Sequence, residues 1–183
     1  LNTFAKPTNV DTSSRILCYD IRDLGKQLQP VGMLVVLDSV FNRIIRNRKL
    51  GKSTWVYIDE IYLLFQHEYS ANFLFTLWKR VRKYGACCTG LTQNVDDLLQ
   101  SHTARTMLAN SEFLVMLNQA ATDRAELAKL LNISDNQLSY ITNVDSGRGL
   151  IKCGSAIVPF MNSFPKNRLY QLMTTRPSET MAA

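Results

Sequence analysis

Histidine and cysteine, which commonly bind metals or take part in nucleophilic catalysis, are scarce in this chain. Its 183 residues include only two histidines and four cysteines, and the cysteines lack metal-ligand spacing. His67 and His102 each stand alone, so we expect both at the surface. The longest apolar run, residues 31–37, stops at Asp38, and we expect no signal peptide. We therefore expect no cysteine-based metal site and no membrane span, and a cytoplasmic location.

The cysteines lie in apolar, strand-like stretches: Cys18, Cys87, Cys88 and Cys153. We expect buried free thiols in a reducing compartment. The adjacent pair, Cys87 and Cys88, is predicted to point to opposite faces of a strand.

The composition is that of a soluble globular domain, with 46% hydrophobic and 20% charged residues. A net charge of +6 fits contact with nucleic acid, an anionic membrane or nucleotide phosphates, and fits a plain soluble surface equally well. The first residue is Leu1 rather than Met, and we expect a piece of a longer polypeptide. We predict a polar lead-in over residues 1–14, a folded region over 15–165, and a C-terminal helix and tail over 166–183.

Two hydrophobic periodicities alternate along the folded region. Short apolar runs typical of buried strands alternate with stretches whose apolar residues recur at helical spacing. The expected strands are 15–20, 54–58, 86–92 and 112–117, and the main expected helices are 30–49, 68–83, 121–131 and 134–140. Pro30 is expected to open the first helix, Gly85 to end the second and Ser134 to cap the last. This order predicts an α/β fold, a mostly parallel sheet with helices on both faces. Residues 149–153 and 156–161 predict a C-terminal β-hairpin.

Polar residues follow each expected strand of this sheet. They are Asp20, Asp59 with Glu60, Gln93 with Asn94, and Asn118 with Gln119. Ligands of open parallel sheets bind at the carboxyl ends of the strands, so these residues are the candidate site.

The most specific pattern in the chain is four apolar residues, 55–58, followed by Asp59 and Glu60. This is the Walker B pattern of nucleotide-hydrolysing motors, in which the first acid holds the magnesium shell and the second polarises the attacking water. Alone it is weak, because such pairs also flank ordinary strands. The next expected strand ends in Thr92 and Gln93, which would set an amide beside the acids. The two strands together are much more specific.

These segments resemble the C-terminal ATPase region of the type IV secretion and conjugative-transfer ATPases, the VirB-four class of the HerA and FtsK group of RecA-like motors. The resemblance covers most of the chain in family order, and its stretches are residues 55–65, 82–94, 107–119, 147–151 and 170–176. It implies a RecA-like P-loop NTPase core in which Asp59 binds the magnesium shell, Glu60 is the catalytic glutamate and Gln93 is the sensor. It also implies ATP and Mg²⁺ as cofactors.

The resemblance further implies a homo-hexamer at the cytoplasmic base of a conjugation or secretion channel, at the inner face of the membrane. Its partners would be other channel components and a DNA or protein substrate, with membrane association through partners. Nucleotide would bind between subunits, and the arginine that meets a neighbour's γ-phosphate has three candidates, Arg105, Arg124 and Arg148, of which Arg105 and then Arg148 rank first. Each also fits a solvated surface arginine.

One element of the family pattern is missing. The sequence contains no GxxxxGK[ST] loop, and Gly51-Lys52-Ser53 imitates only its tail. The position five before Gly51 is Arg46, and the tripeptide leads into a strand rather than a helix, so we predict a surface turn. We expect the true loop before Leu1 and little or no ATP binding by this piece alone.

Three interpretations of the sequence stay open. The first is the Walker B and sensor portion of a secretion or conjugation ATPase. The second is a DNA translocase or coupling protein of the same fold group. The third is a scaffold module that keeps the fold without nucleotide chemistry, against which the pairing of Asp59 and Glu60 with Gln93 argues. The basic helix end at Arg80, Arg82 and Lys83 fits a solvated surface or a contact with DNA or a partner.

Overall fold

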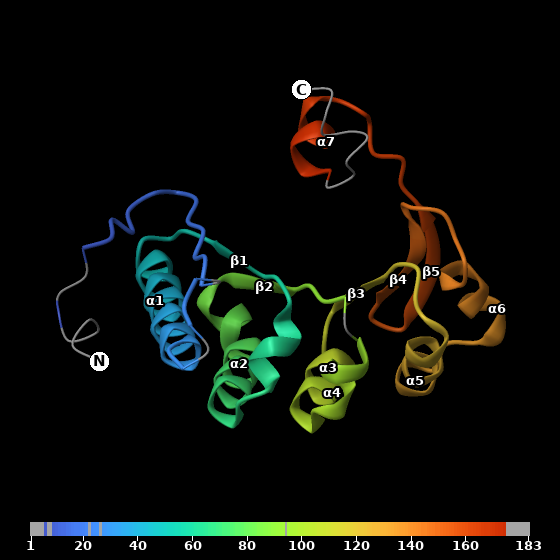
Figure 1. The fold of residues 1–183 in the computed structure, drawn as a ribbon, viewed down its shortest axis with the longest axis horizontal. Coiled ribbons are helices and arrows are strands. Elements are labelled where there is room, and N and C mark those ends of the chain that lie inside the picture. The colour runs from blue at the N-terminus through green and yellow to red at the C-terminus, as the bar shows by residue number, and fades with distance from the viewer. Residues whose placement is uncertain (1–5, 7–8, 22, 26, 94, 175–183) are drawn as a thin grey trace. The chain divides into compact units, whose positions relative to one another are not determined.

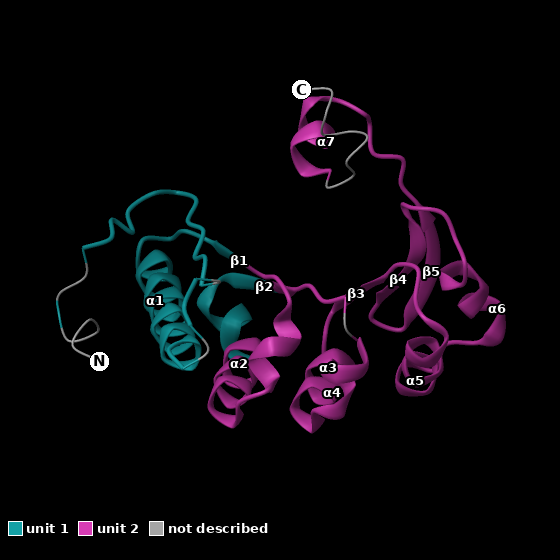
Figure 2. Ribbon diagram, in the orientation of Figure 1, with its two compact units in different colours: residues 1–56, 79–88 teal, residues 57–78, 89–183 magenta. Residues whose placement is uncertain are grey.

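The structure, a computed structural model, describes residues 6, 9–21, 23–25, 27–93 and 95–174. Figure 1 shows the order of its elements. Figure 2 shows two compact units, of which unit 1 comprises residues 1–56 and 79–88 and unit 2 comprises residues 57–78 and 89–183. Helices and strands alternate along the chain, so the expected α/β class is confirmed. Within the described residues, no helix is long and apolar enough to cross a membrane.

Unit 1 is built around the helix α1 (Gln29–Lys49), which has Pro30 in its first turn as the sequence predicts. Its buried side includes Met33, Leu37 and Ile44. Phe41 meets the ring of Tyr84 edge-on, with 5.6 Å between the ring centroids. Tyr84 belongs to the short 3-10 helix η3 (Val81–Tyr84), so this contact joins η3 to α1.

The strand expected over residues 15–20 is absent: these described residues have no regular secondary structure. Ile16 is 81% exposed, and Tyr19 instead anchors the segment to α1 through a 2.9 Å hydrogen bond between its hydroxyl and that of Ser39. An apolar run becomes a strand only when a neighbouring strand pairs with its backbone groups. Among the residues described, none pairs with this run, so the prediction was wrong.

The parallel part of the fold is a sheet of two strands, β1 (Thr54–Ile58) and β2 (Ala86–Gly90). The N–H of Thr54 donates to Gly85 where both strands begin, and the N–H of Leu91 donates to Ile58 where both end. The strands therefore run in the same direction. The chain between them forms η2 (Ile61–Phe65), α2 (Glu68–Arg80) and η3.

The expected fourth strand, β3 (Phe113–Met116), lies in a separate antiparallel sheet. It pairs with β4 (Arg148–Cys153), which pairs in turn with β5 (Ala156–Met161). The C-terminal hairpin is thus confirmed. In the described residues β3 bonds to this hairpin and not to β2. Periodicity alone does not reveal a strand's partner.

Helices fill the rest of unit 2. They are α3 (Val95–Gln100), α4 (His102–Ala109), α5 (Ala121–Leu131), α6 (Asp135–Leu138), η4 (Ser139–Ile141) and α7 (Arg168–Met173). Ser134 begins α6 with a capping box, in which its hydroxyl accepts the N–H of Gln137 and the Gln137 side chain accepts the N–H of Ser134. Such a cap contributes about 1 kcal/mol. The cap predicted at Ser134 is confirmed.

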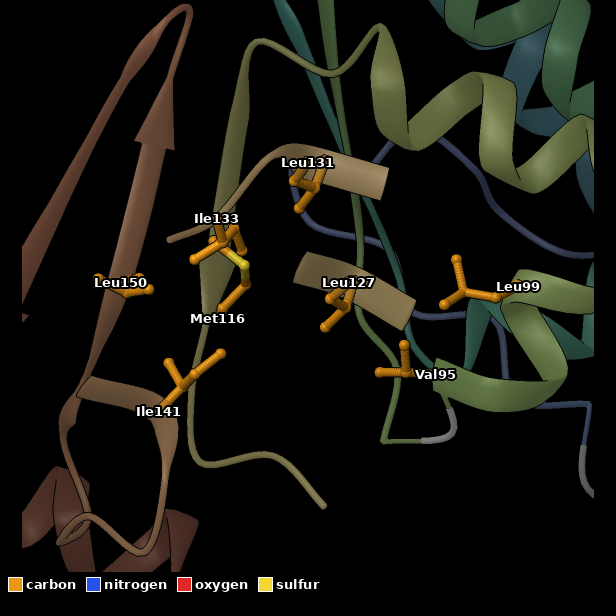
Figure 3. Packing of buried hydrophobic residues seen from close by; sticks show 8 residues of the cluster. All are labelled: Val95, Leu99, Met116, Leu127, Leu131, Ile133, Ile141 and Leu150. Atoms are coloured by element: carbon orange, nitrogen blue, oxygen red, sulfur yellow. The ribbon is translucent and has the colours of Figure 1, made fainter. Parts of the chain in front are cut away.

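One hydrophobic cluster connects β3 and β4 to the helices of unit 2 (Figure 3). Its buried members are Val95, Leu99, Met116, Leu127, Leu131, Ile133, Ile141 and Leu150. Ile141 and Leu150 are fully buried. The cluster packs on the face of the sheet that carries Met116 and Leu150, which are paired across β3 and β4.

The four cysteines are free, as expected, but three of them are exposed rather than buried. Cys87 and Cys88 sit on β2, whose pleat turns them to opposite sides. Only Cys88 is partly covered, and its burial, with a smaller effect from Cys87, raises the pKa of its thiol to about 12. The prediction of burial assumed a sheet covered on both faces.

Gly149 allows two strands of unit 2 to lie close together. A Cβ at this position would overlap the backbone carbonyl of Met116 on β3. We predict that Gly149→Ala lowers the free energy of unfolding by about 1–3 kcal/mol, because β4 must shift to relieve the overlap. Urea denaturation followed by circular dichroism measures this. Gly25→Ala is the control, since a Cβ there meets no atom within 4 Å. Equal effects of both substitutions would contradict the prediction.

Candidate functional site

The site is built where β1 and β2 end. The residue after β2, Leu91, forms two backbone hydrogen bonds: its N–H donates to Ile58 at 2.8 Å, and its carbonyl accepts from Ile61 at 2.9 Å. The chain after β1 is therefore held against the chain after β2 on both sides of Asp59 and Glu60. This bonding fixes the backbone of the two acids without relying on their side chains.

Gly90 makes this close approach sterically possible. A Cβ at position 90 would lie 2.5 Å from Cδ1 of Ile61 and 3.2 Å from its Cγ2. Ile61 is buried, so its side chain has little room to move aside. The Thr-Gly-Leu-Thr-Gln segment thus needs glycine for packing, not for backbone conformation.

Glu60 adopts a left-handed backbone conformation with φ of 47° and ψ of 50°. For a residue with a Cβ this conformation costs roughly 1–2 kcal/mol. Two hydrogen bonds compensate: the N–H of Glu60 donates to Oδ1 of Asp59 at 3.1 Å, and the Glu60 carboxylate accepts the N–H of Gln93 at 3.4 Å. Strained residues of this kind are concentrated at functional sites.

Gln93 contacts Glu60 through its backbone rather than through the side-chain amide that the sequence pattern sets beside the acids. Its N–H contacts Glu60, and its side chain is exposed. Asn94, expected beside it, lies outside the described residues. The sequence pattern identified the two segments that meet, but not the backbone contact between them.

Asn118 and Gln119, the polar residues after β3, hold loops in unit 2. Oδ1 of Asn118 accepts the N–H of Val144 at 3.3 Å, and the N–H of Gln119 donates to Ile141 at 3.0 Å. Their hydrogen bonds thus serve the fold. Asp20 belongs to unit 1 and follows no strand. It was a candidate because it was expected at the carboxyl end of a strand, so this reason no longer holds.

The three candidate arginines all have partners in unit 2. Arg105 donates to the carbonyl of Leu99 and lies 3.5 Å from Glu126. Arg124 donates to the carbonyl of Gln119 at 3.1 Å. Arg148 lies 3.6 Å from Asp145 three residues earlier in the chain. None of these contacts brings an arginine to Glu60.

The glycines beside Arg148 serve the fold rather than a ligand. Gly147 has φ of 83°, and a Cβ there would overlap the carbonyl of Asn162. Gly149 is buried against β3 as described above. The backbone therefore approaches Asn162 at Gly147 and β3 at Gly149, both within the fold.

Residues 51–53 form the surface turn that the sequence predicts. Gly51 has φ of 67°, all three residues are exposed, and the chain passes from them directly into β1. The N–H of Lys52 donates to the carbonyl of Asn47, which closes the turn after α1. Because a strand follows, this segment has no helix N-terminus to bind phosphate.

Asp59 fits a magnesium shell by its donor chemistry. It is exposed, and only Oδ1 has a protein donor among the described residues. Mg²⁺ in nucleotide sites takes one or two carboxylates together with waters and phosphate oxygens, so a single carboxylate suffices. Within the described residues there is no group of three or more His, Cys, Asp or Glu that would bind a metal without nucleotide.

A parallel strand that ends in Asp-Glu, fixed beside a parallel strand followed by Thr-Gln, is typical of P-loop nucleotide-hydrolysing domains. The comparison with protein families agrees. The chain belongs to the TraG P-loop domain family, which matches residues 9–151. The family resemblance expected from the sequence is thereby confirmed.

Among solved structures, the chain is similar to VirB4 of Thermoanaerobacter pseudethanolicus, with a TM-score of 0.70 and 24% sequence identity. The match covers 80% of this chain and 40% of that one, so this chain spans well under half of the VirB4 structure. At this identity the likeness shows the fold, and it confirms the RecA-like α/β class. No curated protein matches the sequence.

The strain at Glu60 is measurable by comparing two substitutions that both remove the carboxylate. We predict that Glu60→Gly is more stable than Glu60→Ala by about 1 kcal/mol, because glycine adopts the left-handed conformation without steric cost. Chemical denaturation of both variants gives the difference. At Glu112, which lacks a positive φ, the same pair serves as control and glycine should give no gain. A glycine advantage at both positions would refute strain at Glu60.

Proposed function

We propose that this chain supplies the Walker B and sensor portion, over residues 15–165, of an ATP-hydrolysing motor of a type IV secretion or conjugative DNA-transfer apparatus. Residues 1–14 are its lead-in and 166–183 its C-terminal helix and tail. The carrying observation is the acid pair Asp59 and Glu60, held by Leu91 and Gln93 at the ends of two parallel strands. Membership of the TraG P-loop domain family supports this function.

Each residue of the site has a role in this proposal. Asp59, exposed at the end of β1, holds the magnesium shell, and bound Mg²⁺ neutralises charge on the nucleotide phosphates. Glu60 polarises the attacking water and accepts its proton. Gln93 senses the γ-phosphate, and its backbone bond to Glu60 couples the sensor segment to the catalytic carboxylate. The left-handed backbone holds Glu60 in place before nucleotide arrives.

The phosphate-binding loop belongs, in this proposal, to sequence outside these 183 residues. Two exposed apolar sheet faces support the presence of further protein that packs on them. On β1, Trp55 and Tyr57 are 65% and 67% exposed. On the sheet of unit 2, Phe113, Val115 and Val158 share one face and are all more than half exposed. Contiguous apolar faces are normally covered in a folded protein.

The working assembly in this proposal is a homo-hexamer at the cytoplasmic face of the membrane, in contact with other channel components and with a DNA or protein substrate. A neighbouring subunit then supplies an arginine to the γ-phosphate. Arg148 is the better candidate on structural grounds: its side chain is 51% exposed, and its ion pair among the described residues is with the more exposed Asp145. Arg105 is held by both Leu99 and Glu126, which fits a structural role.

A coupling-type DNA translocase uses the same site and differs in the domains attached to it. A scaffold without chemistry is disfavoured by Glu60, because a residue kept only for the fold at φ of 47° would be glycine or asparagine.

The central test is ATP turnover by the protein that contains this chain together with its phosphate-binding loop. We predict that Glu60→Gln lowers turnover by about 100-fold or more while nucleotide binding persists, because the amide cannot accept a proton from water. Phosphate release and binding of a fluorescent nucleotide are measured in the same preparation.

Glu68→Gln, an exposed acid in the first turn of α2, is the matched control and should leave turnover unchanged. Unchanged turnover in Glu60→Gln would remove Glu60 from the catalytic role. An absence of turnover in the unsubstituted protein would favour the scaffold.

The arginine roles separate in the same assay. We predict that Arg148→Ala lowers turnover by roughly 10³-fold with little change in stability, as expected for a residue acting on a neighbour's phosphate. Arg105→Ala should keep turnover within about threefold and lose up to about 1 kcal/mol of stability, the usual range for a surface ion pair. The reverse pattern would assign the arginine role to Arg105.

A further inference from the structure

The charges of the chain are divided unevenly between its two units. Unit 1 contains 13 Lys and Arg and four Asp, a net charge of +9, and unit 2 carries −3, which together give the +6 of the whole chain. The modest overall charge thus conceals a strongly basic unit. Neither the proposed ATPase site nor its acids lie in unit 1, so hydrolysis does not explain this charge.

Seven exposed basic residues of unit 1 form two groups that the fold joins. The first group lies at the end of α1 and in the turn after it, and comprises Arg46, Arg48, Lys49 and Lys52. The second lies at the end of α2 and in η3, and comprises Arg80, Arg82 and Lys83. We call these seven residues the basic surface.

Tyr84 holds the two groups of the basic surface together. Its ring packs edge-on against Phe41, and the guanidinium carbon of Arg48 lies 5.4 Å from its centroid. Helix α1 and η3 are therefore in direct contact within one compact unit. Two groups that are separated by 28 positions in the sequence, from Lys52 to Arg80, thus belong to the same compact unit.

No acidic residue lies close in sequence to the seven residues of the basic surface. Residues 39–58 and 69–95 contain no Asp or Glu. None of the ion pairs formed among the described residues involves the seven side chains. A solvated protein surface normally mixes both signs, and a single-sign cluster raises the local concentration of anions. The basic surface is therefore available to a polyanion.

The chemistry of this surface favours duplex nucleic acid over other polyanions. Four of its seven residues are arginines, whose planar fork binds phosphate oxygens in pairs. Single strands are bound by stacking bases on free aromatic rings. The ring that joins the two groups, Tyr84, is already packed between Phe41 and Arg48, and the exposed Trp55 lies on β1, outside the basic surface. Membrane surfaces select several apolar side chains among the charges, whereas Leu50 is the one exposed apolar residue between Arg46 and Lys52.

We propose that the basic surface of α1 and η3 binds the phosphate backbone of duplex DNA without reading its sequence. Contacts to phosphates alone carry no base specificity and depend strongly on salt. This proposal does not depend on the ATPase assignment, because its residues lie in unit 1 and those of the site in unit 2.

The test uses the protein that contains this chain and a fluorescein-labelled 24-base-pair duplex of arbitrary sequence, with binding followed by anisotropy between 50 and 200 mM salt. The variant Arg48→Glu, Lys49→Glu, Arg82→Glu, Lys83→Glu should bind about tenfold more weakly or worse at 100 mM salt. The slope of log K against log salt should fall by about 2 or more, since each lost phosphate contact removes roughly 0.9.

Two further variants accompany the fourfold variant. One reverses charges of unit 2, and the other neutralises charges of the basic surface instead of reversing them. Lys129→Glu with Arg168→Glu reverses exposed charges of unit 2. It should change the affinity for DNA by less than about twofold and leave the salt slope unchanged. Arg82→Gln with Lys83→Gln removes charge without reversing it, and should weaken binding even if the fourfold variant does not fold. Circular dichroism confirms folding of each variant.

Three results would overturn the proposal. The first is no duplex binding at 50 mM salt. The second is an equal loss in the unit 2 variant, which would mean that only net charge matters. The third is tighter binding to vesicles of phosphatidylcholine and phosphatidylserine, or to polyglutamate, than to duplex, which would assign the surface to a membrane or an acidic protein.

Discussion

The proposed site depends on the two-way hydrogen bonding of Leu91. Its N–H and carbonyl bond to the residues on either side of Asp59 and Glu60, so the chain after one strand is tied to the chain after the next. The hydrogen bonds that Glu60 forms with Asp59 and Gln93 then add to this backbone restraint. Because the restraint is carried by the backbone, substitution of either acid should leave the loop in place. This makes the chemistry of the two acids separable from their contribution to folding.

The sequence predicted the local elements of this fold well. Helix α5 begins and ends where its periodicity does, Ser134 caps α6, Pro30 lies in the first turn of α1 and Gly85 ends the connection before β2. These features depend on a few neighbouring residues, and their physical causes are visible in the sequence. The same holds for the acid pair after β1, where a change from apolar to acidic residues marks the end of the strand.

Features set by distant partners were not predictable in this way. The run at residues 15–20 has the composition of a strand but no described neighbour to pair with, and β3 joins the hairpin rather than the parallel sheet. Likewise, nothing in the sequence shows that Gly90 makes room for Ile61 or that Glu60 is left-handed. The positive φ of Glu60 is invisible because glutamate rarely adopts it, and only the surrounding bonds impose it.

The exposure of Trp55 gives the molecule an optical signal of its own. The chain has two tryptophans, and they differ in environment: Trp55 is 65% exposed on β1, whereas Trp78 is partly buried and donates its indole N–H to Ser111 at 3.3 Å. An indole in water emits at longer wavelength than one in an apolar surrounding. Any protein layer that covers the face of β1 would therefore shift the emission of Trp55 to the blue, so that binding of such a layer to this sheet could be followed without a label.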